Sequence, residues 1–257
     1  MADRDDILSE LGLTPIWRLR ALAKTATGDV ESPAGVSPAG AVRDASLPEA
    51  GPTPGGADAR LDRIAKIEWG DFAADVDACT ACALCRGRRK SVPGVGDPHA
   101  EWLLVGEAPG AEEDARGEPF VGQAGKLLDN MLAALGMKRG ENVYIANVLK
   151  CRPPNNRTPE PLEVEACRPY LDRQIALIKP KLIVALGKSA ATTLLDVDAS
   201  IASLRGRVHR YRGVPLVVTY HPAYLLRNLP DKSKAWEDLL FARRTLRGAG
   251  ASGSSPQ

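Results

Sequence analysis

Short apolar runs alternate with segments of helical periodicity between about residue 60 and residue 247. Four runs of strand length predict buried β-strands: EWLLVGE (Glu101–Glu107), VYIANVLK (from Val143), KLIVALG (Lys181–Gly187) and VPLVVTYHP (from Val214). Five segments predict helices from the spacing of their apolar residues: 61–78, 123–136, 161–178, 188–195 and 233–247. Because strands that alternate with helices form parallel sheets covered on both faces, we predict an α/β fold, a three-layer α/β/α sandwich with a central, mostly parallel sheet.

The N-terminal part of the chain has a different composition. Residues 5–20 place a few apolar side chains at helical spacing, so residues 1–24 predict a short amphipathic motif that binds a protein partner. A helix docked on the core explains the same pattern equally well. Residues 25–58 are rich in Ala, Gly, Pro, Ser and Thr and predict a disordered linker, because they bury too little apolar surface to offset their chain entropy. The folded domain is expected at 59–247, with a disordered tail at 248–257.

Composition and charge narrow the class of protein. A chain of 257 residues, 44% of them hydrophobic, is long enough for one substantial core. No apolar run is long enough to span a bilayer and the N-terminus has no secretory signal, so we expect a cytoplasmic, nucleoid-associated protein without a membrane partner. We also expect a monomer. Residues 1–75 carry 8 Lys/Arg and 13 Asp/Glu, whereas residues 76–257 carry 26 and 19. This basic excess suits a polyanion, although most basic runs are simply solvated surfaces.

Three of the five cysteines lie within seven residues, in CTACALC (Cys79–Cys85), and the others are Cys151 and Cys167. An odd number excludes complete disulfide pairing, and disulfides are rare in a reducing compartment. Four thiolates hold either zinc or an iron–sulfur cluster, and the spacing alone does not choose between them. Cys82 forms a Cys-x2-Cys pair with either Cys79 or Cys85, so both pairings stay open at this point.

Polar groups follow several predicted strands, at the positions where open parallel sheets bind their ligands. GEAPG (Gly106–Gly110) is a Gly/Pro turn after the first strand, Asn147 lies in the second strand segment, and HPAYLLR (His221–Arg227) follows the last strand. Each segment is weak evidence by itself, because Gly/Pro turns are common and an Asn at a strand end is ordinarily a cap or turn residue. All three are expected at the carboxyl edge of the sheet.

Taken in order, these segments resemble the uracil-DNA glycosylase superfamily, in particular its family 4, which carries an iron–sulfur cluster. The matching pieces are CTAC, GEAPGAEED, GEPFVGQAGKLLD, NVLKCRPP, Cys167 and HPAYLLR, and they extend over about residues 79–240. The resemblance implies a DNA repair enzyme that hydrolyses the N-glycosidic bond of uracil and leaves an abasic site, the first step of base excision repair. Because the reacting atoms are hidden in a duplex, uracil must first be flipped out of the DNA.

The resemblance also implies how the flipped uracil is held. Phe120 would stack on the base, and Asn147 would contact its Watson–Crick edge, since one amide can donate to O4 and accept from N3–H. His221 is implied to be catalytic, because it would face O2, where negative charge develops as the bond breaks. The ordinary alternatives are a core position for Phe120 and a cap or turn role for Asn147.

The residue that activates water is a separate question. Better-known branches of the superfamily have an Asp at the position of Ala108, and family 4 lacks this Asp as well. We therefore expect the adjacent Glu107 to position the water and to contact uracil, although its backbone rather than its carboxylate could make the contact. Ala108 and Pro109 complete this side of the expected uracil site. Gly110 replaces a Tyr that excludes the thymine methyl group in the branch with Asp, and Glu113 is a candidate for that exclusion.

HPAYLLR has an expected second role in binding uracil-containing DNA. Leu225 or Leu226 fits an apolar wedge that fills the space left by the flipped base, and Arg227 fits a phosphate contact. Core packing explains the two leucines equally well.

For the cysteines, the resemblance favours one four-iron, four-sulfur (4Fe-4S) cluster per chain over zinc. The ligands that it implies are Cys79, Cys82, Cys151 and Cys167. Cys85 is then the spare thiol. Since hydrolysis transfers no electrons, we expect the cluster to tie loops together and to hold the basic segment Arg86–Lys90 near DNA.

Three other functions fit parts of the pattern. A related branch bonds covalently to the abasic sugar through a histidine on an extra basic loop, but the CRPPNNRTP segment has no histidine and no such insertion. A glycosylase could act on hypoxanthine or other deaminated bases instead of uracil. A non-enzymatic DNA-binding or redox module with a cluster would bind uracil-containing DNA without releasing uracil.

Overall fold

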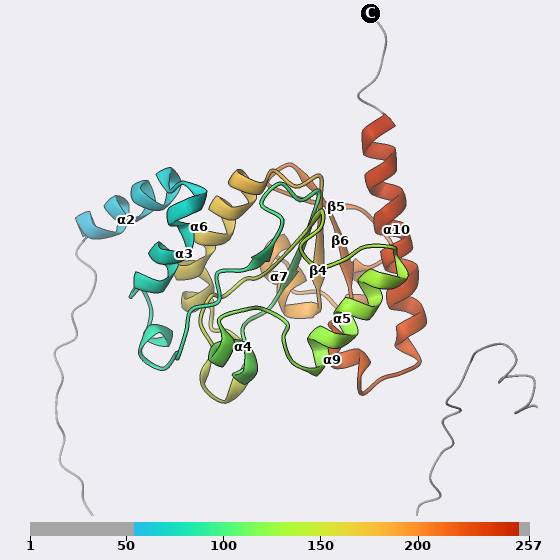
Figure 1. Ribbon diagram of the computed structural model, residues 1–257, viewed down its shortest axis with the longest axis horizontal. Coiled ribbons are helices and arrows are strands. Elements are labelled where there is room, and N and C mark those ends of the chain that lie inside the picture. The colour runs from blue at the N-terminus through green and yellow to red at the C-terminus, as the bar shows by residue number, and fades with distance from the viewer. Residues whose placement is uncertain (1–53, 252–257) are drawn as a thin grey trace, which may run out of the picture. The chain divides into compact units, whose positions relative to one another are not determined.

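A six-stranded sheet with helices on both faces forms the centre of residues 54–251, the part of the chain that the computed structural model describes (Figure 1). The strands are β1 (Val95–Gly96), β2 (Trp102–Gly106), β3 (Val143–Asn147), β4 (Leu182–Leu186), β5 (His209–Tyr211) and β6 (Val214–Thr219). Their order across the sheet is β1-β3-β2-β4-β6-β5. β2, β3, β4 and β6 run parallel, and the edge strands β1 and β5 are antiparallel to their neighbours.

Helices precede, separate and follow these strands. The α-helices are α2 (Pro54–Lys66), α3 (Trp69–Ala78), α4 (Ala111–Arg116), α5 (Gln123–Ala134), α6 (Pro161–Ile178), α7 (Lys188–Leu195), α8 (Ile201–Leu204), α9 (Pro222–Leu225) and α10 (Asp231–Ala251). Two short 3-10 helices are η1 (Ala83–Arg86) and η2 (Pro154–Asn156). Within residues 54–251, no helix combines the length and the apolar character needed to cross a membrane.

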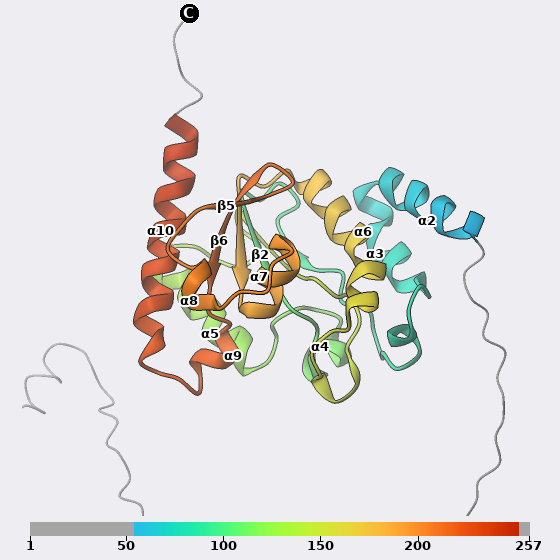
Figure 2. The ribbon, with the colours of Figure 1, turned by 180° about the vertical axis from the view of Figure 1, so that it is seen from behind.

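The central strands are buried on both faces, which explains their continuous apolar sequences. On β2, Trp102 and Leu104 belong to an apolar cluster with α5 and α10, whereas Leu103 and Val105 belong to a second cluster with α6, α7 and α8. Figure 1 shows α5 and α10 on one side of the sheet, and the reverse view in Figure 2 shows α7 and α8 on the other. The predicted α/β/α sandwich with a mostly parallel central sheet is therefore confirmed.

The single helix predicted over 61–78 is wrong, because the chain breaks between α2 and α3 at Ile67 and Glu68. The backbone carbonyl of Ile67 accepts hydrogen bonds from the guanidinium of Arg173 on α6. Because this carbonyl is engaged by a side chain 106 residues away, it does not continue the helical hydrogen-bond ladder. Both helices pack on α6 through a third apolar cluster that contains Phe72.

Two predicted boundaries also shift. α2 begins at Pro54, inside the predicted linker, and α10 continues to Ala251, inside the predicted tail. These extensions contain small and polar residues, so apolar periodicity could not reveal them. The predicted motif at 1–24 and the linker as far as residue 53 lie outside the described residues.

The edge strands β1 and β5 were not predicted. β1 is two residues long, and β5 is three residues long with only Tyr211 buried, so neither carries an apolar run. Edge strands pair on one side only and need less apolar sequence than central strands.

The four parallel strands bring their carboxyl ends to one edge of the sheet. β2 ends at Gly106, which is paired with Asn147 at the end of β3, and β4 and β6 end at Leu186 and Thr219 beside them. The three segments singled out from the sequence therefore begin at the same edge.

Candidate functional site

A cavity of about 490 Å³ lies at this carboxyl edge. Its lining residues are Glu107, Ala108, Pro109, Gly110, Glu113, Phe120, Ala124, Asn147, Pro153, Asn156, Arg157, His221, Ala223 and Arg227. They include every residue predicted to bind uracil, together with Arg227. Pro153 lies inside the NVLKCRPP motif but was not predicted as a site residue. Asn156 and Arg157 were not predicted either, and the signal that could have found them is their position just after this motif.

Asn147 brings an unpaired acceptor to this cavity. The residue is 2% exposed, and its Oδ1 has no hydrogen-bond partner in the described part of the chain. Leaving a buried acceptor unpaired costs about 1–3 kcal/mol, so such an atom points to a ligand that supplies a donor. A Cβ on Gly106 would overlap this Oδ1 and would lie 2.6 Å from Cζ of Phe120, which explains the glycine at the end of β2.

Phe120 is held in an unusual backbone conformation. Its φ is 55°, in the left-handed region that non-glycine residues rarely adopt. The ring is buried, and its centroid lies 5.4 Å from that of the His221 ring at an interplanar angle of 30°. Phe120 thus occupies the core, as the ordinary alternative proposed, and also lines the cavity. Strained residues of this kind concentrate at functional sites.

His221 is neutral at physiological pH. Burial lowers its pKa to about 4; the Glu113 carboxylate opposes this shift, and Arg227 adds to it. Its Nδ1 accepts the backbone N–H of Ala223 at 3.1 Å, so the ring proton of the neutral form is assigned to Nε2. Gly187 has a φ of 95°, and a Cβ there would lie 2.8 Å from Cβ of His221, so a side chain at this position would displace the histidine.

Glu107 is partly buried and lines the same cavity. Burial raises the pKa of its carboxyl group, whereas a hydrogen bond with Ser189 lowers it. Its backbone carbonyl accepts the Leu149 N–H at 3.1 Å. Because that carbonyl is engaged within the protein, the carboxylate is the better candidate for a contact with water.

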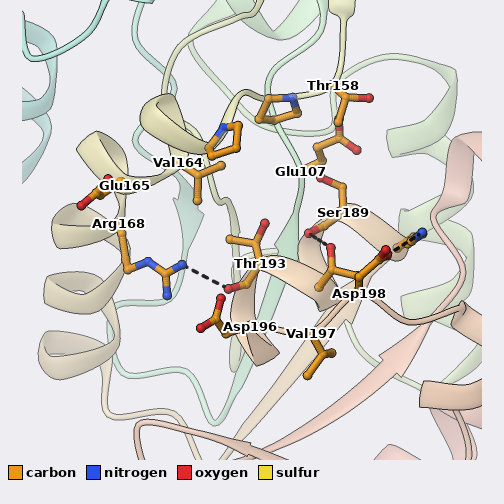
Figure 3. Close-up of a pocket in the computed structure, with 14 residues that line it drawn as sticks. Glu107, Thr158, Val164, Glu165, Arg168, Ser189, Thr193, Asp196, Val197 and Asp198 are labelled. Carbon is orange, nitrogen blue, oxygen red and sulfur yellow. Dashed lines mark hydrogen bonds and ion pairs between the residues drawn. The ribbon is translucent and has the colours of Figure 1, made fainter.

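Glu107 also lines a second cavity of about 1020 Å³, between α6 and α7 (Figure 3). This cavity has charges of both signs: Lys188 pairs with Asp198 at 3.1 Å, and Arg168 donates to the carbonyl of Thr193 at 3.4 Å. None of the other predicted uracil-binding residues lines it. We therefore take the smaller cavity as the candidate active site.

Glu113 connects two loops of this site. Its Oε2 accepts the Gly110 N–H at 3.1 Å, and its Oε1 accepts the N–H groups of Val121 and Gly122 at 3.0 and 3.3 Å. The carboxylate thus holds the GEAPG turn against the loop that carries Phe120.

All five cysteines line a separate small cavity, formed by the end of α3, the loop with η1, the chain after β3, and α6. They are free thiols. The backbone N–H of Lys150 donates to Sγ of Cys167 at 3.3 Å, and Nη1 of Arg88 donates to Sγ of Cys151 at 3.0 Å. Donors of this kind stabilise thiolates, whereas burial of the sulfurs opposes their ionisation.

Cys79 has the most favourable surroundings for a thiolate. Burial opposes ionisation, but hydrogen bonds with the Ala81 backbone, the Tyr170 hydroxyl and Arg60 lower its pKa overall. Nη2 of Arg60 lies 3.7 Å from its sulfur.

The other three predicted ligands are close to Cys79. Burial raises the pKa of Cys82 and of Cys151, and raises that of Cys167 to about 12. A negative charge on Cys79 further raises the pKa of each of these three thiols. The three sulfurs therefore lie within electrostatic range of Cys79. The charge of Cys85 also raises the pKa of Cys82, but by less than burial and the charges of Cys79 and Glu163 do.

Lys150 connects the cysteine cavity to the candidate active site. The residue is 1% exposed, and its Nζ donates to the backbone carbonyl of Asn147 at 2.8 Å and to Oε1 of Gln174. Burial lowers its pKa to about 8, while the charges of Cys167 and Cys151 raise it. Negative charge on these two sulfurs would therefore favour the ammonium form of Lys150, whose Nζ holds the end of β3.

Comparison with known proteins identifies the family. Residues 93–240 match the model of the uracil DNA glycosylase superfamily. The chain belongs to this superfamily. A type-4 uracil-DNA glycosylase from Archaeoglobus fulgidus is 48% identical over 164 residues, which cover 61% of this chain and 82% of the relative. One from Thermotoga maritima is 44% identical over 179 residues, 68% of this chain and 93% of the relative. A type-5 uracil-DNA glycosylase from Thermus thermophilus is 32% identical over 194 residues, 59% of this chain and 86% of the relative. The predicted resemblance to family 4 is confirmed.

In this superfamily member, the two candidate wedge residues differ in exposure. Leu225 is 1% exposed and packs inside the protein, as the core-packing alternative expected, which makes it the weaker candidate for the wedge. Leu226 is 42% exposed, and Arg227 beside it is exposed at the cavity. Leu229, which the sequence analysis did not consider, is 60% exposed on the same loop. Only one face of the short helix α9 packs against the protein, so Leu225 is buried and the adjacent Leu226 is exposed.

Among residues 54–251, no three or more His, Cys, Asp or Glu side chains are placed to hold one metal ion. The five cysteines nevertheless share one cavity, and their sulfur donors suit either zinc or an iron–sulfur cluster. The cluster itself stays a prediction.

Proposed function

We propose that the protein is a uracil-DNA glycosylase that flips uracil out of DNA and hydrolyses its N-glycosidic bond, which releases uracil and leaves an abasic site. Membership of the superfamily and the similarity to type-4 enzymes support this function. The observation that carries it is the unpaired, buried Oδ1 of Asn147 in a cavity that Phe120 and His221 also line.

The cavity can recognise uracil by shape and by hydrogen bonds. The ring of Phe120 offers a surface on which the flipped base stacks. Oδ1 of Asn147 would accept the N3–H of uracil, and its amide nitrogen would donate to O4. Cytosine has no N3–H and has an amino group in place of O4, so both contacts would fail. Because the N3–H of uracil is a donor, the unpaired atom of Asn147 has to be an acceptor, as Oδ1 is.

His221 can stabilise the departing base. As the glycosidic bond breaks, negative charge develops on O2 of uracil. A neutral histidine with its proton on Nε2 donates to that oxygen, and the interaction is stronger in the transition state than in the ground state. The Ala223 N–H fixes this tautomer from the other side of the ring.

Glu107 is our candidate for positioning the water that attacks the sugar. Its carboxylate lies between two cavities and is partly desolvated, which keeps its pKa above the usual range for glutamate. A carboxylate of this kind accepts a hydrogen bond from water and orients it. Ala108 leaves no acid at the neighbouring position, so Glu107 has no direct competitor there.

We also infer that Cys79, Cys82, Cys151 and Cys167 hold one 4Fe-4S cluster. The shared cavity and the N–H groups directed at sulfur support a site for bound thiolates, and the resemblance to family 4 favours a cluster over zinc. When bound, the cluster would join α3, the end of β3 and α6, and it would anchor the basic segment Arg86–Lys90. The hydrolysis itself transfers no electrons, so its steps belong to the residues of the active site.

The proposed function is tested with an oligonucleotide that contains a single uracil. We expect release of free uracil and formation of an alkali-labile site, with no release from the same oligonucleotide that carries thymine or cytosine. An oligonucleotide with hypoxanthine tests the alternative substrate. Tight binding of the uracil oligonucleotide without base release would instead favour a non-enzymatic DNA-binding module.

Cysteine variants test the cluster and its ligands. After anaerobic purification, we expect Cys85→Ala to keep the iron, sulfide and visible absorbance of the unaltered protein. Cys82→Ala should lose most of all three, because three thiolates do not complete the site. Loss in Cys85→Ala with retention in Cys79→Ala would make Cys79 the spare thiol. A colourless protein that contains only zinc would refute the cluster.

Leucine variants test the wedge. Leu225→Ala is expected to lower the free energy of unfolding by about 2–5 kcal/mol, because it leaves a cavity in the core. Leu226→Ala should change it by less than about 0.5 kcal/mol. Leu226→Ala should slow uracil release from duplex DNA more than from single strands, since only a duplex leaves a gap in the stack. Urea unfolding and release rates measure the two effects, and equal slowing on both substrates would contradict the wedge.

A further inference from the structure

The loop that carries Phe120 stores backbone strain. A left-handed conformation is sterically unfavourable for a non-glycine residue, and here it belongs to a large aromatic residue. Such a conformation persists only if neighbouring groups hold it in place. The ring of Phe120 can stack on uracil only while the backbone stays in this conformation.

Arg139 holds this loop from one side. Its Nη1 donates to the carbonyl of Pro119 and its Nη2 donates to the carbonyl of Phe120, both at 2.8 Å. Its Nε donates to Oδ1 of Asp129 on α5 at 2.9 Å, so all three nitrogens of the guanidinium are used. The Arg139 side chain is 21% exposed and the Asp129 side chain is 48% exposed. A planar fork that binds two successive carbonyls fixes the peptide between them.

The carbonyl group of Phe120 is tightly packed and accepts a hydrogen bond from Arg139. A Cβ on Gly125 would overlap this carbonyl oxygen, so the loop is packed directly against α5. After Phe120 along the chain, the Glu113 carboxylate accepts the N–H groups of Val121 and Gly122. A cation thus binds the carbonyls of Phe120 and the residue before it, and an anion binds the N–H groups after the strained residue.

We propose that Arg139 is a positioning residue for uracil recognition, which it serves by holding the Phe120 backbone in its left-handed conformation, and that Asp129 orients Arg139. This inference rests on the proposed function, because it concerns the stacking of uracil. Arg139 does not line the cavity and so acts through Phe120. Lysine keeps the charge but cannot bind two carbonyls in one plane, so Arg139→Lys is the informative change.

The experiment compares kcat, KM and inhibition by free uracil on a single-stranded uracil oligonucleotide. For Arg139→Lys we expect kcat/KM to fall about 10- to 100-fold and inhibition by uracil to weaken, because the stacking ring is misplaced. KM for the oligonucleotide should stay within about twofold, because the contacts to DNA outside the cavity are intact. Asp129→Asn should weaken uracil inhibition in the same direction by a smaller factor.

The matched control is Lys138→Ala, next to Arg139, which removes an exposed ion pair between Lys138 and Glu141. It should leave all three quantities unchanged. Thermal melting and iron content establish that each variant is folded, and if Arg139→Lys does not fold, Asp129→Asn carries the test.

The decisive measurement is a double-mutant cycle with Phe120→Ala. If Arg139 acts through Phe120, Arg139→Lys should cause less than about a twofold further loss in the Phe120→Ala background. A full additional loss of about 10-fold there, or unchanged uracil inhibition in Arg139→Lys, would overturn the inference. Uracil release by the unaltered protein tests the proposed function separately, and its absence would overturn both.

Discussion

Asn147→Asp is expected to lower kcat/KM for uracil release about a thousandfold or more. The substitution preserves the shape of the side chain and removes one donor. An ionised carboxylate at this position would repel O4 of uracil instead of donating to it, and the charge would sit at a place that is 2% exposed in the unaltered protein. Sites built to make hydrogen bonds lose about 10⁴–10⁵ when a buried partner is left unpaired, so the expected factor is a conservative one.

The control for this prediction is Asn130→Asp. Asn130 lies on the exposed face of α5, so the same chemical change there should leave the rate unchanged. Release rates are measured with substrate below KM, and circular dichroism and melting establish that both variants are folded. If Asn147→Asp kept more than a tenth of the unaltered kcat/KM, Asn147 would not be the residue that recognises the uracil edge.

His221→Leu is expected to lower kcat about 10²- to 10³-fold, the usual effect of removing one donor from a developing anion. Leucine fills a similar volume beside Phe120 but supplies no proton. His99→Ala is the matched control, because His99 is exposed and lies outside the cavity. Retention of full activity by His221→Leu would mean that another group stabilises the departing uracil.

The low pKa of His221 also predicts a pH dependence. The neutral ring is the active form and its pKa is about 4, so the contribution of His221 to kcat should stay constant from pH 8 down to about pH 5. Below that range the ring gains a second proton, and Nδ1 can no longer accept the Ala223 N–H. A histidine with an ordinary pKa of about 6.5 in this position would instead lose activity below about pH 6.5.

The same pKa affects stability. Between pH 6.5 and pH 4 the unfolded chain binds a proton at His221 that the folded chain does not bind, so the free energy of unfolding rises with pH in this window. From pH 7 to pH 5 the loss due to this residue is about 2 kcal/mol, at about 1.36 kcal/mol per pH unit below the unfolded pKa. Urea unfolding at the two pH values measures it, and the decrease should be smaller by this amount in His221→Leu. An equal decrease in both proteins would contradict the low pKa.

Several elements could be predicted from the chain because their signals are local. α7 (Lys188–Leu195) and α6 (Pro161–Ile178) begin and end at the predicted residues, since Gly187 and Pro161 mark their starts. The central strands are buried on both faces, so each is an uninterrupted apolar run. GEAPG, Asn147 and His221 were predicted because they lie at or just after strand ends, whereas Phe120, between α4 and α5, was predicted only from the resemblance to the family.

Other features depend on contacts between distant residues. Arg173 ends α2 by binding the carbonyl of Ile67 across 106 residues, and no local pattern records such a bond. Arg139 and Glu113 hold the loop of Phe120 through backbone atoms, which have the same chemistry in every residue. A sequence shows which side chains are present but not which backbone groups they bind.

The sequence by itself determined the class of fold, the order of its elements and the family. The fold class and element order follow from periodicity and the family from a series of short motifs, which are properties of neighbouring residues, and the resemblance to the family supplied the candidate uracil-binding residues. The tertiary structure alone decided that Leu225 is buried and Leu226 exposed, that Asn147 has an unpaired oxygen, and that Phe120 is strained. Burial, hydrogen-bond satisfaction and strain are relations between atoms that the chain brings together only when it folds.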